Sequence, residues 1–417
     1  MQVVGKSNNC HTITTDSLNK NLNKDEVELN PTVQKSLQNI ILKEGFKSHK
    51  ISKRLISTNG SNYMGQLYEI DVRGRTREGD KEIHMFLKHV IPGEAIKSLL
   101  SVDISYSNEV FFYNELCDIY NRLQENANVP EEEKFKIIKS YECNSDAIIL
   151  ENIARTGFKS LYRMDVVPIQ FAELIISQLA KFHGLSFVLK HRKIDYFKNN
   201  IETIESPLNF DKDVWVTFVK KQFAMSVLYF NSDVQKKIDN FLQNKFIEKF
   251  PKYSTGVTES VKCLCHGDFR TSNVMVKEKG ENNQEVVVID YQFLFYRSPV
   301  TDIMHFIYTG TDRKFREAHM NDLKDLYHKE LTEFLQYFDL NGNDVYPREV
   351  YDKDFEDSLD YGLMIGLYVL PIIFTEEDKF PDFGKESINN MSFKMSNRHK
   401  DRITEIVEEY LENGILN

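Results

Sequence analysis

Three polar side chains lie at the ends of short apolar runs in and just beyond the stretch CLCHGDFRTSNVMV, residues 263–276. Asp268 and Asn273 stand between two strand-like segments, and Asp290 directly follows the run EVVVI. Carboxylate and amide oxygens at neighbouring strand ends make a hard-oxygen site that suits Mg²⁺. With Asn273 and Asp290 on the metal, Asp268 is left as an acid or base beside it. Such a set predicts phosphoryl transfer, in which a metal neutralises phosphate oxygens and a carboxylate orients the attacking hydroxyl.

Some of these side chains also admit plainer interpretations. Asp268 alone could cap a turn after a strand, as many loop aspartates do. His266 could be a metal ligand or a base, but we expect it to pack and to hold the loop by hydrogen bonds. Cys263 and Cys265 alternate along a strand-like run, so both face one side. We interpret them as small buried hydrophobes rather than as a metal-binding pair.

The elements that must position these residues follow from periodicity and turn signals. Apolar spacing predicts a helix that starts at Pro31 and ends near Gly45. Strand-like runs flank the turn-rich segment RGRTREGDK, which indicates a hairpin. A short strand is expected at 146–153, helices at 107–123, 166–187, 210–250 and 300–417, and a strand–loop–strand–turn–strand insert around 263–290. The order is a β-rich first third, followed by a helical body with a small β insert.

Length and composition limit the class of protein. A chain of 417 residues is long for one compact core, so two lobes or domains are expected. The formal net charge of -10 argues against a protein that mainly binds nucleic acid. Five cysteines in no regular pattern fit a reducing compartment better than a disulfide framework.

No segment is typical of secretion or membrane insertion. The polar residues 1–30 lack an apolar core of the length that a secretory signal needs, and we expect them to form a flexible extension. The longest apolar run, 363–374, is too short to cross a bilayer and contains Pro371. The sequence therefore predicts a cytoplasmic protein with no membrane or nucleic-acid partner, and we expect a monomer.

The motif HGDFRTSNVMV, followed by VVVIDYQFLFYRSPVTDI, resembles the catalytic signature of the ecdysteroid kinase-like family, which is related to choline and aminoglycoside phosphotransferases. The resemblance implies that Asp268 is the catalytic base and that Asn273 and Asp290 hold the metal. It also implies that Asp302 braces the catalytic loop without touching the substrate. One position departs from the pattern, because Arg270 stands where the family often has Trp, and this could alter substrate contacts.

The first third of the chain resembles the nucleotide-binding part of the same family. The run FLKHVIP resembles the strand that carries a phosphate-binding lysine, here Lys88, and Glu109 on the next helix resembles its acidic partner. An ammonium group needs such an anchor to stand over nucleotide phosphates as a fixed charge. In AIILENI, the carbonyl of Glu151 and the amide of Ile153 would bond the adenine edge.

A turn ahead of this strand, in TNGSNYMGQLYEI, resembles the turn that covers the phosphates. Gly60, Ser61 and Asn62 would approach them through backbone groups, although an Asn-containing turn alone needs no ligand. The fold that the resemblance implies is a two-lobed, protein-kinase-like α+β structure. A small N-terminal nucleotide-binding lobe with an antiparallel sheet would span 31–152, and a larger, mainly helical catalytic and acceptor-binding lobe would span 153–417.

The implied function is ATP- and Mg²⁺-dependent phosphorylation of an alcohol hydroxyl, with the side chain of an ecdysteroid as the acceptor that the resemblance suggests. Other small alcohols stay open as acceptors, among them a dietary toxin, an aminoglycoside or a choline-like amino alcohol. A catalytically silent nucleotide- or steroid-binding protein is the alternative that involves no turnover. Metal-dependent phosphohydrolysis through His266 and Asp268 lacks further His and Asp ligands, and it leaves Lys88 and Glu109 unexplained.

Overall fold

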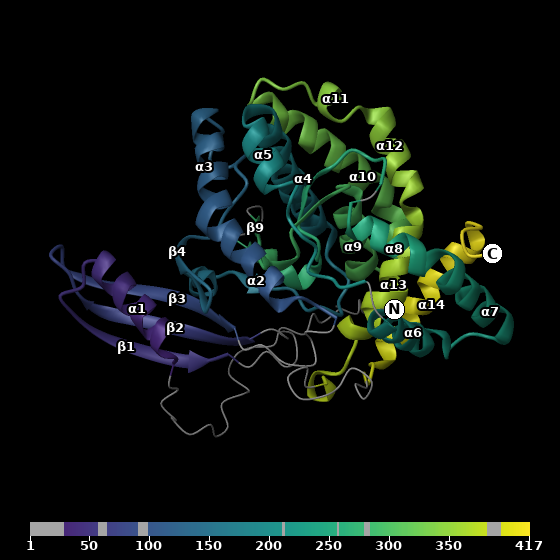
Figure 1. Cartoon of the computed structure of the whole chain (residues 1–417), viewed down its shortest axis with the longest axis horizontal. Helices are drawn as coiled ribbons and strands as arrows, with labels where there is room; N and C mark the ends of the chain where they lie inside the picture. Colours follow the sequence, from purple (N-terminus) through teal and green to yellow (C-terminus); the bar gives the residue numbers. More distant parts are fainter. Residues whose placement is uncertain are drawn as a thin grey trace, which may run out of the picture.

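The computed structural model describes residues 29–56, 65–90, 99–210, 213–256, 258–278, 284–381 and 393–417. Figure 1 shows two lobes, a small one built on a sheet of long strands and a larger one made mainly of helices. The two-lobed α+β architecture expected from the sequence is therefore confirmed.

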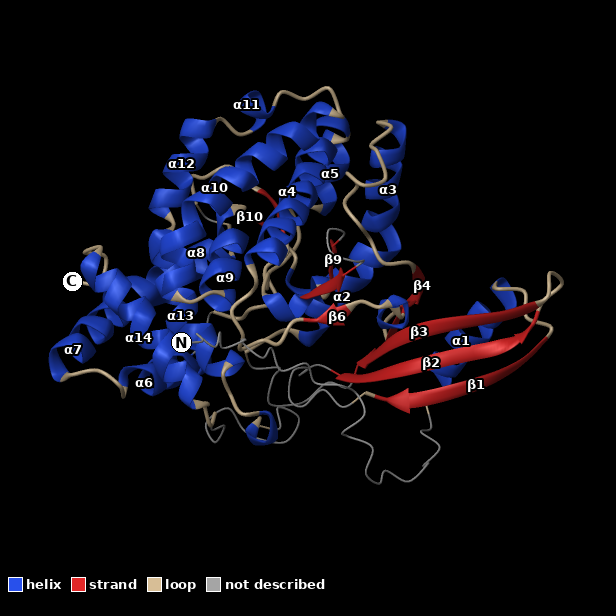
Figure 2. Ribbon diagram, turned by 180° about the vertical axis from the view of Figure 1, so that it is seen from behind, coloured by secondary structure: helices blue, strands red, loops and turns tan. Residues whose placement is uncertain are grey.

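The small lobe contains a five-stranded antiparallel sheet in the order β1-β2-β3-β5-β4. Alternate side chains of β2, namely Tyr68, Ile70 and Val72, are buried, as the period of two in a strand requires. They share one apolar cluster with the helix α1, which lies on this face of the sheet (Figure 2). The elements are α1 (Pro31–Lys43), β1 (Ser48–Leu55), β2 (Gly65–Arg75), β3 (Asp80–Val90), β4 (Ser140–Cys143) and β5 (Ala147–Glu151).

The ends of α1 follow from its sequence. The side chain of Asn30 accepts a hydrogen bond of 2.8 Å from the backbone N–H of Val33, which caps the helix. Pro31 takes the first helical position, where a missing N–H does no harm. Gly45 follows the last turn with a φ of +80°, the left-handed conformation that commonly ends helices.

An interrupted helix leads from the sheet toward the larger lobe. It consists of α2 (Val102–Phe111), a π-helical turn (Phe112–Leu116) and α3 (Cys117–Asn126). Its buried side chains join the core of the larger lobe and not the cluster beneath the sheet. The ring of Phe112 stacks on that of Tyr291, with centroids 3.4 Å apart. This helix is therefore fixed to the larger lobe, although it precedes β4 and β5 in the chain.

The larger lobe surrounds one continuous apolar core. Within it α4 packs along α10, and α13 packs on α9 (Figure 1). Its helices are α4 (Ile169–Arg192), α5 (Ile194–Asn200), α6 (Asp213–Val227), α7 (Ser232–Phe241), α8 (Ile247–Ser254), α9 (Val300–Gly310), α10 (Arg313–Gln336), α11 (Gly342–Val345), α12 (Arg348–Asp357), α13 (Leu359–Ile373) and α14 (Asn397–Glu412). Its strands are β6 (Lys159–Ser160), β7 (Cys263–Cys265), β8 (Val274–Glu278), β9 (Gln284–Val288) and β10 (Phe295–Arg297).

These short strands frame the loop that the sequence motif singled out. β7 pairs with β10, and β8 lies between β6 and β9. Gly267, directly after β7, has a φ of +87°, and a Cβ atom there would lie 2.0 Å from the carbonyl oxygen of Phe293. Only glycine fits this close approach. The motif's glycine thus allows the loop to lie against the chain that follows β9.

Most of the elements expected from the sequence are confirmed, and four strands among the described residues, β1, β4, β6 and β10, were not predicted. The hairpin of β2 and β3, the strands β5 and β7 to β9, and the helices α1 to α4, α6 to α8 and α9 to α14 lie where expected. β1 was missed because its residues SHKISKRL are mostly exposed and include three charged side chains, as is common at a sheet edge. β4, β6 and β10 were missed because they are short. The apolar run around Pro371 belongs to α13, and no helix among the described residues is long and apolar enough to span a membrane.

Candidate active site

A cavity of about 520 Å³ lies between the two lobes and gathers most of the predicted site residues. The sheet contributes Lys88 from β3 and Glu151 from the end of β5, and α2 contributes Glu109. Asn273 and Asp290 line it from the larger lobe. Apolar lining residues are Leu67, Phe86, Leu150, Ile153, Met275 and Ile289. The walls are thus apolar on several sides, with charged groups on the side where the lobes meet.

Lys88 is the centre of the charged groups in this cavity. Its ammonium nitrogen lies 2.5 Å from Glu109 Oε2, 2.9 Å from Asp290 Oδ1 and 3.2 Å from Gln292 Oε1. Burial by itself lowers the pKa of Lys88, but the charges of Asp290 and Glu109 outweigh it and raise the pKa above its ordinary value. The ammonium group is therefore charged and fixed. Its contact with Asp290 joins the sheet to the larger lobe.

Asp290 owes its position to an uncommon backbone conformation. It follows β9 with φ +71° and ψ +62°, in the left-handed region, where Asp occurs more often than most residues. The chain then enters a short 3₁₀ turn at Tyr291–Phe293. The reversal places the Asp290 carboxylate against Lys88, while its second oxygen accepts a bond of 3.3 Å from the amide of Gln292.

The loop after β7 holds Asp268 and Asn273 together. The amide nitrogen of Asn273 donates to the backbone carbonyl of Asp268 at 2.8 Å and to its Oδ2 at 3.0 Å. Arg270 Nε donates to the same Oδ2 at 3.1 Å. Burial raises the pKa of Asp268, but the positive charge of Arg270 and the neighbouring groups outweigh it and hold the pKa below its ordinary value. The carboxylate is ionised, and the amide oxygen of Asn273 is the atom left for a cation.

Asp302 at the start of α9 fixes the backbone of this loop from behind. Its side chain is fully buried and accepts the N–H of His266 at 2.6 Å and that of Gly267 at 2.9 Å. Arg297 lies 3.5 Å and His183 3.2 Å from its two oxygens. Burial raises the pKa of Asp302, but the bond to His183 and the charge of Arg297 bring it far below the usual range. The contact geometry is the one that a brace for the loop requires.

His266 holds the loop from a second direction. Its Nε2 donates to the carbonyl of Ile289 at 2.9 Å, directly before Asp290. One imidazole thereby connects the chain two residues before Asp268 to the residue directly before Asp290. The expectation that His266 packs and holds the loop by hydrogen bonds agrees with this geometry.

The oxygen atoms of Asn273 and Asp290 fit a hard divalent cation. Both residues line the same cavity, and an amide oxygen with a carboxylate is a donor set that Mg²⁺ accepts. Lys88 beside them would serve nucleotide phosphates. Gly60, Ser61 and Asn62, assigned above to the phosphate-covering turn, lie outside the described residues.

The structure adds three contacts that sequence reasoning missed. Gln292 touches Lys88, and the letters DYQ within the motif were a signal for it. Arg270, considered above only for substrate contacts, lies against Asp268. His305 on α9 lies with Nε2 at 3.4 Å from Asp268 Oδ1. It is buried, and neither of its ring nitrogens has a hydrogen-bond partner among the described residues.

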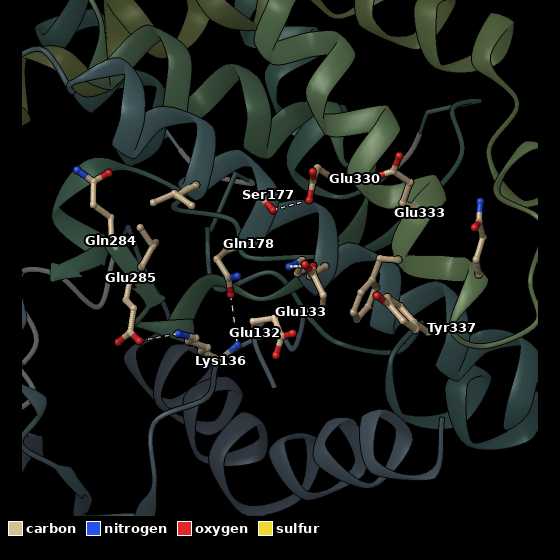
Figure 3. A pocket seen from close by; sticks show the side chains of 15 residues that line it. Glu132, Glu133, Lys136, Ser177, Gln178, Gln284, Glu285, Glu330, Glu333 and Tyr337 are labelled. Atoms are coloured by element: carbon tan, nitrogen blue, oxygen red, sulfur yellow. Dashed lines mark hydrogen bonds and ion pairs between the residues drawn. The ribbon is translucent and has the colours of Figure 1, made fainter. Parts of the chain in front are cut away.

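A larger cavity, of about 720 Å³, lies elsewhere and contains none of the predicted site residues (Figure 3). It is bordered by α4, α10, β9 and the segment 132–136. Lys136 pairs with Glu285 at 3.2 Å, and Ser177 donates to Glu330 at 2.6 Å. Several of its polar groups are thus paired with one another, and size alone does not make it the candidate site.

The chain was compared with known protein families, curated proteins and solved structures. The sequence pattern of the ecdysteroid kinase-like family matches residues 59–340. No curated protein sequence gave a significant match. An ethanolamine kinase of Plasmodium vivax has 14% identity and a TM-score of 0.42, over 87% of this chain and 83% of that one.

Two further solved structures are similar at the same distant level. A microcompartment-associated aminopropanol kinase has 10% identity and a TM-score of 0.38, over 92% of this chain and 99% of that one. An aminoglycoside 2′-phosphotransferase in complex with GDP has 11% identity and a TM-score of 0.37, over 91% and 97%. The sequence match spans more than half of the chain and includes Lys88, Glu109, Asp268, Asn273 and Asp290. This protein belongs to the ecdysteroid kinase-like family.

Proposed function

We propose that this protein is a phosphotransferase that moves the γ-phosphoryl group of ATP to a hydroxyl group of a small alcohol. The observation that carries the proposal is the set of groups across one cavity. Lys88 is anchored by Glu109 on one side, and Asp290 and Asn273 offer oxygen donors on the other. An ionised Asp268 lies next to Asn273. Phosphoryl transfer is catalysed largely by such positioning and charge stabilisation.

Each side chain takes one role in this proposal. Lys88, fixed by Glu109, binds nucleotide phosphate oxygens as a point charge. Asn273 and Asp290 hold Mg²⁺, which when bound neutralises charge on the phosphate oxygens. The carbonyl of Glu151 and the amide of Ile153 bond the adenine edge where the small lobe, which we assign to residues 31–152, joins the larger lobe.

Asp268 orients the acceptor hydroxyl and receives its proton. Its low pKa makes it a weak base, and this suits a loose transition state in which the hydroxyl loses its proton late. Asn273 and Arg270 keep the carboxylate in place by holding Oδ2. Oδ1 remains the oxygen for the acceptor, with His305 behind it. The acceptor would lie against the larger lobe, residues 153–417.

An ecdysteroid is the acceptor that family membership puts first, with its side-chain hydroxyl as the target. We further propose a cytoplasmic, monomeric enzyme.

The test is ADP formation with Mg²⁺ and ATP over a panel of ecdysteroids, sterol-like plant toxins and amino alcohols. Asp268→Asn is the blank and should lower turnover by at least about 100-fold while ATP still binds. Asp165→Asn, at an exposed aspartate paired with Arg398, is the matched control and should keep full turnover. Turnover on an ecdysteroid supports the whole proposal, and turnover only on other alcohols moves the acceptor. ATP binding without turnover on any alcohol would contradict the proposed enzyme and favour a silent binding protein.

A further inference from the structure

A second group of donor side chains lies in the core of the larger lobe, behind the catalytic loop. Cys263, Cys265 and His183 are each fully buried. The two sulfur atoms are 3.8 Å apart, and the imidazole nitrogen and both sulfurs lie within 4.8 Å of one another. No other three His, Cys, Asp or Glu side chains converge in this way within the described ranges.

The local structure explains why these three side chains meet. Cys263 and Cys265 are two residues apart on β7, so a strand places both on one face. His183 approaches that face from α4. Its Nδ1 lies 2.8 Å from the hydroxyl of Tyr327 on α10, and its Nε2 lies 3.2 Å from Asp302 Oδ2. An outer partner on one ring nitrogen is the arrangement that commonly orients a metal-binding histidine.

We propose that Cys263, Cys265 and His183 form a binding site for one thiophilic metal ion, with Zn²⁺ as the reference ion. Tetrahedral Zn²⁺ binds thiolate sulfur at about 2.3 Å, which places two such sulfurs about 3.8 Å apart. The observed separation is 3.8 Å, so the sulfurs need no rearrangement to meet this requirement. In the sequence, the alternation of Cys263 and Cys265 favoured their interpretation as small buried hydrophobes. The structure adds the imidazole of His183 beside the two sulfur atoms.

The charges also suit a buried site. Two thiolates and a neutral imidazole balance the charge of Zn²⁺, so no net charge is left in the core by the ion and its ligands. Binding breaks the two S–H bonds and the Nε2–H bond that His183 directs to the Asp302 carboxylate, and these three protons go to solvent, while the proton on Nδ1 is donated to the hydroxyl of Tyr327. Asp302 keeps the bonds from His266 and Gly267 and the contact with Arg297 when the imidazole turns to the metal.

Such an ion would connect β7 to α4 directly before the catalytic loop begins. Cys265 is followed by His266, Gly267 and Asp268 in the chain. The inference does not depend on the acceptor or on turnover, because it concerns a separate group of side chains on the far side of the loop.

The test measures metal binding in the full chain, without an activity assay. Protein produced with added Zn²⁺ should retain about one ion per chain after dialysis, and metal-free protein titrated with Cd²⁺ should develop the ultraviolet thiolate-to-cadmium band. The double variant Cys263→Ser, Cys265→Ser should lose both signals. Cys143→Ser, at a buried cysteine of the small lobe, is the matched control and should keep both.

A second variant separates binding from folding. Tyr327→Phe removes the outer partner of His183 but keeps the ring, and it should weaken metal binding about 10- to 100-fold. Circular dichroism of every variant reports whether it is folded. A folded wild-type protein that retains no Zn²⁺ and gives no cadmium band overturns the proposal, as does a band that survives in the double variant. A wild-type protein that binds the metal but shows no phosphotransferase activity would contradict only the proposed function.

Discussion

Substitution of Asp302 should remove several of the hydrogen bonds and charge contacts that hold the catalytic loop, without changing a residue that lines the cavity. Asp302→Ala takes away the acceptor of the His266 and Gly267 N–H bonds, at 2.6 and 2.9 Å. It also leaves Arg297 and His183 without the buried carboxylate that faces both. We expect metal-free Asp302→Ala to be strongly destabilised and to lose turnover, although Asp302 is not among the residues that line the cavity.

The magnitude follows from the burial of all these groups. Removing one partner of a buried ion pair costs about 3–5 kcal/mol, and stranded N–H donors overlap with that loss and are not added to it. An unfolding entropy of about 2.1 cal/mol/K per residue gives roughly 0.9 kcal/mol/K for a chain of 417 residues. A loss of about 4 kcal/mol therefore lowers the melting temperature by about 5 °C, and by more if the larger lobe unfolds separately.

The assay is thermal unfolding followed by circular dichroism, with ADP formation measured on the same samples. Asp165→Ala is the control, because Asp165 is 56% exposed and its pair with Arg398 at 2.7 Å should contribute no more than about 1 kcal/mol. If Asp302→Ala melts at the temperature of this control and keeps its turnover, the loop does not depend on the buried carboxylate and the reasoning is refuted.

Three further substitutions test the charged groups of the site. Lys88→Met should lower kcat/KM by about 100-fold or more and also destabilise the fold, because Glu109 is left buried without its partner. Adding Glu109→Gln should restore the melting temperature but not the turnover. Restored turnover would contradict the role of Lys88. Asp290→Ala should weaken Mg²⁺-dependent nucleotide binding, and unchanged metal titration curves would count against Asp290 as a ligand. Burial lowers the pKa of His305 to about 4, below its unfolded value of about 6.5. Titration of His305 therefore does not affect the free energy of unfolding above about pH 6.5, and it lowers that free energy as the pH falls toward 4. Between pH 7 and pH 5 His305 should lower the free energy of unfolding by an amount on the order of 2 kcal/mol. Urea unfolding at pH 7 and at pH 5 should therefore show a smaller decrease for His305→Gln than for the wild type.

The sequence predicted the parts of the site that lie close together in the chain. Asp268 and Asn273 stand in one loop, and the structure shows them hydrogen-bonded. Lys88 and Glu109 were paired through the resemblance, and they lie 2.5 Å apart. The contact of Lys88 with Asp290 was not predicted, because it depends on how two lobes far apart in the sequence pack on each other.

Other features could not be predicted because the local pattern of apolar and polar residues does not indicate them. His305 lies on a helix whose neighbours are apolar, so periodicity classes it with the core, and only the packing of α9 brings it to Asp268. The strand β1 reads as a polar segment because its charged side chains face solvent on both sides of an edge. The helix carrying Glu109 precedes two strands of the small lobe, yet its apolar face belongs to the other core.

The ion pair between Lys88 and Asp290 has a consequence for the order of binding. A phosphate that draws Lys88 away from Asp290 exposes a carboxylate to a second negative group, which is unfavourable unless a cation arrives with it. A divalent cation on Asp290 has the opposite problem, since it would lie near the Lys88 ammonium until a phosphate separates the two charges. Nucleotide and cation should therefore bind with positive cooperativity, and each should raise the affinity of the other by the same factor.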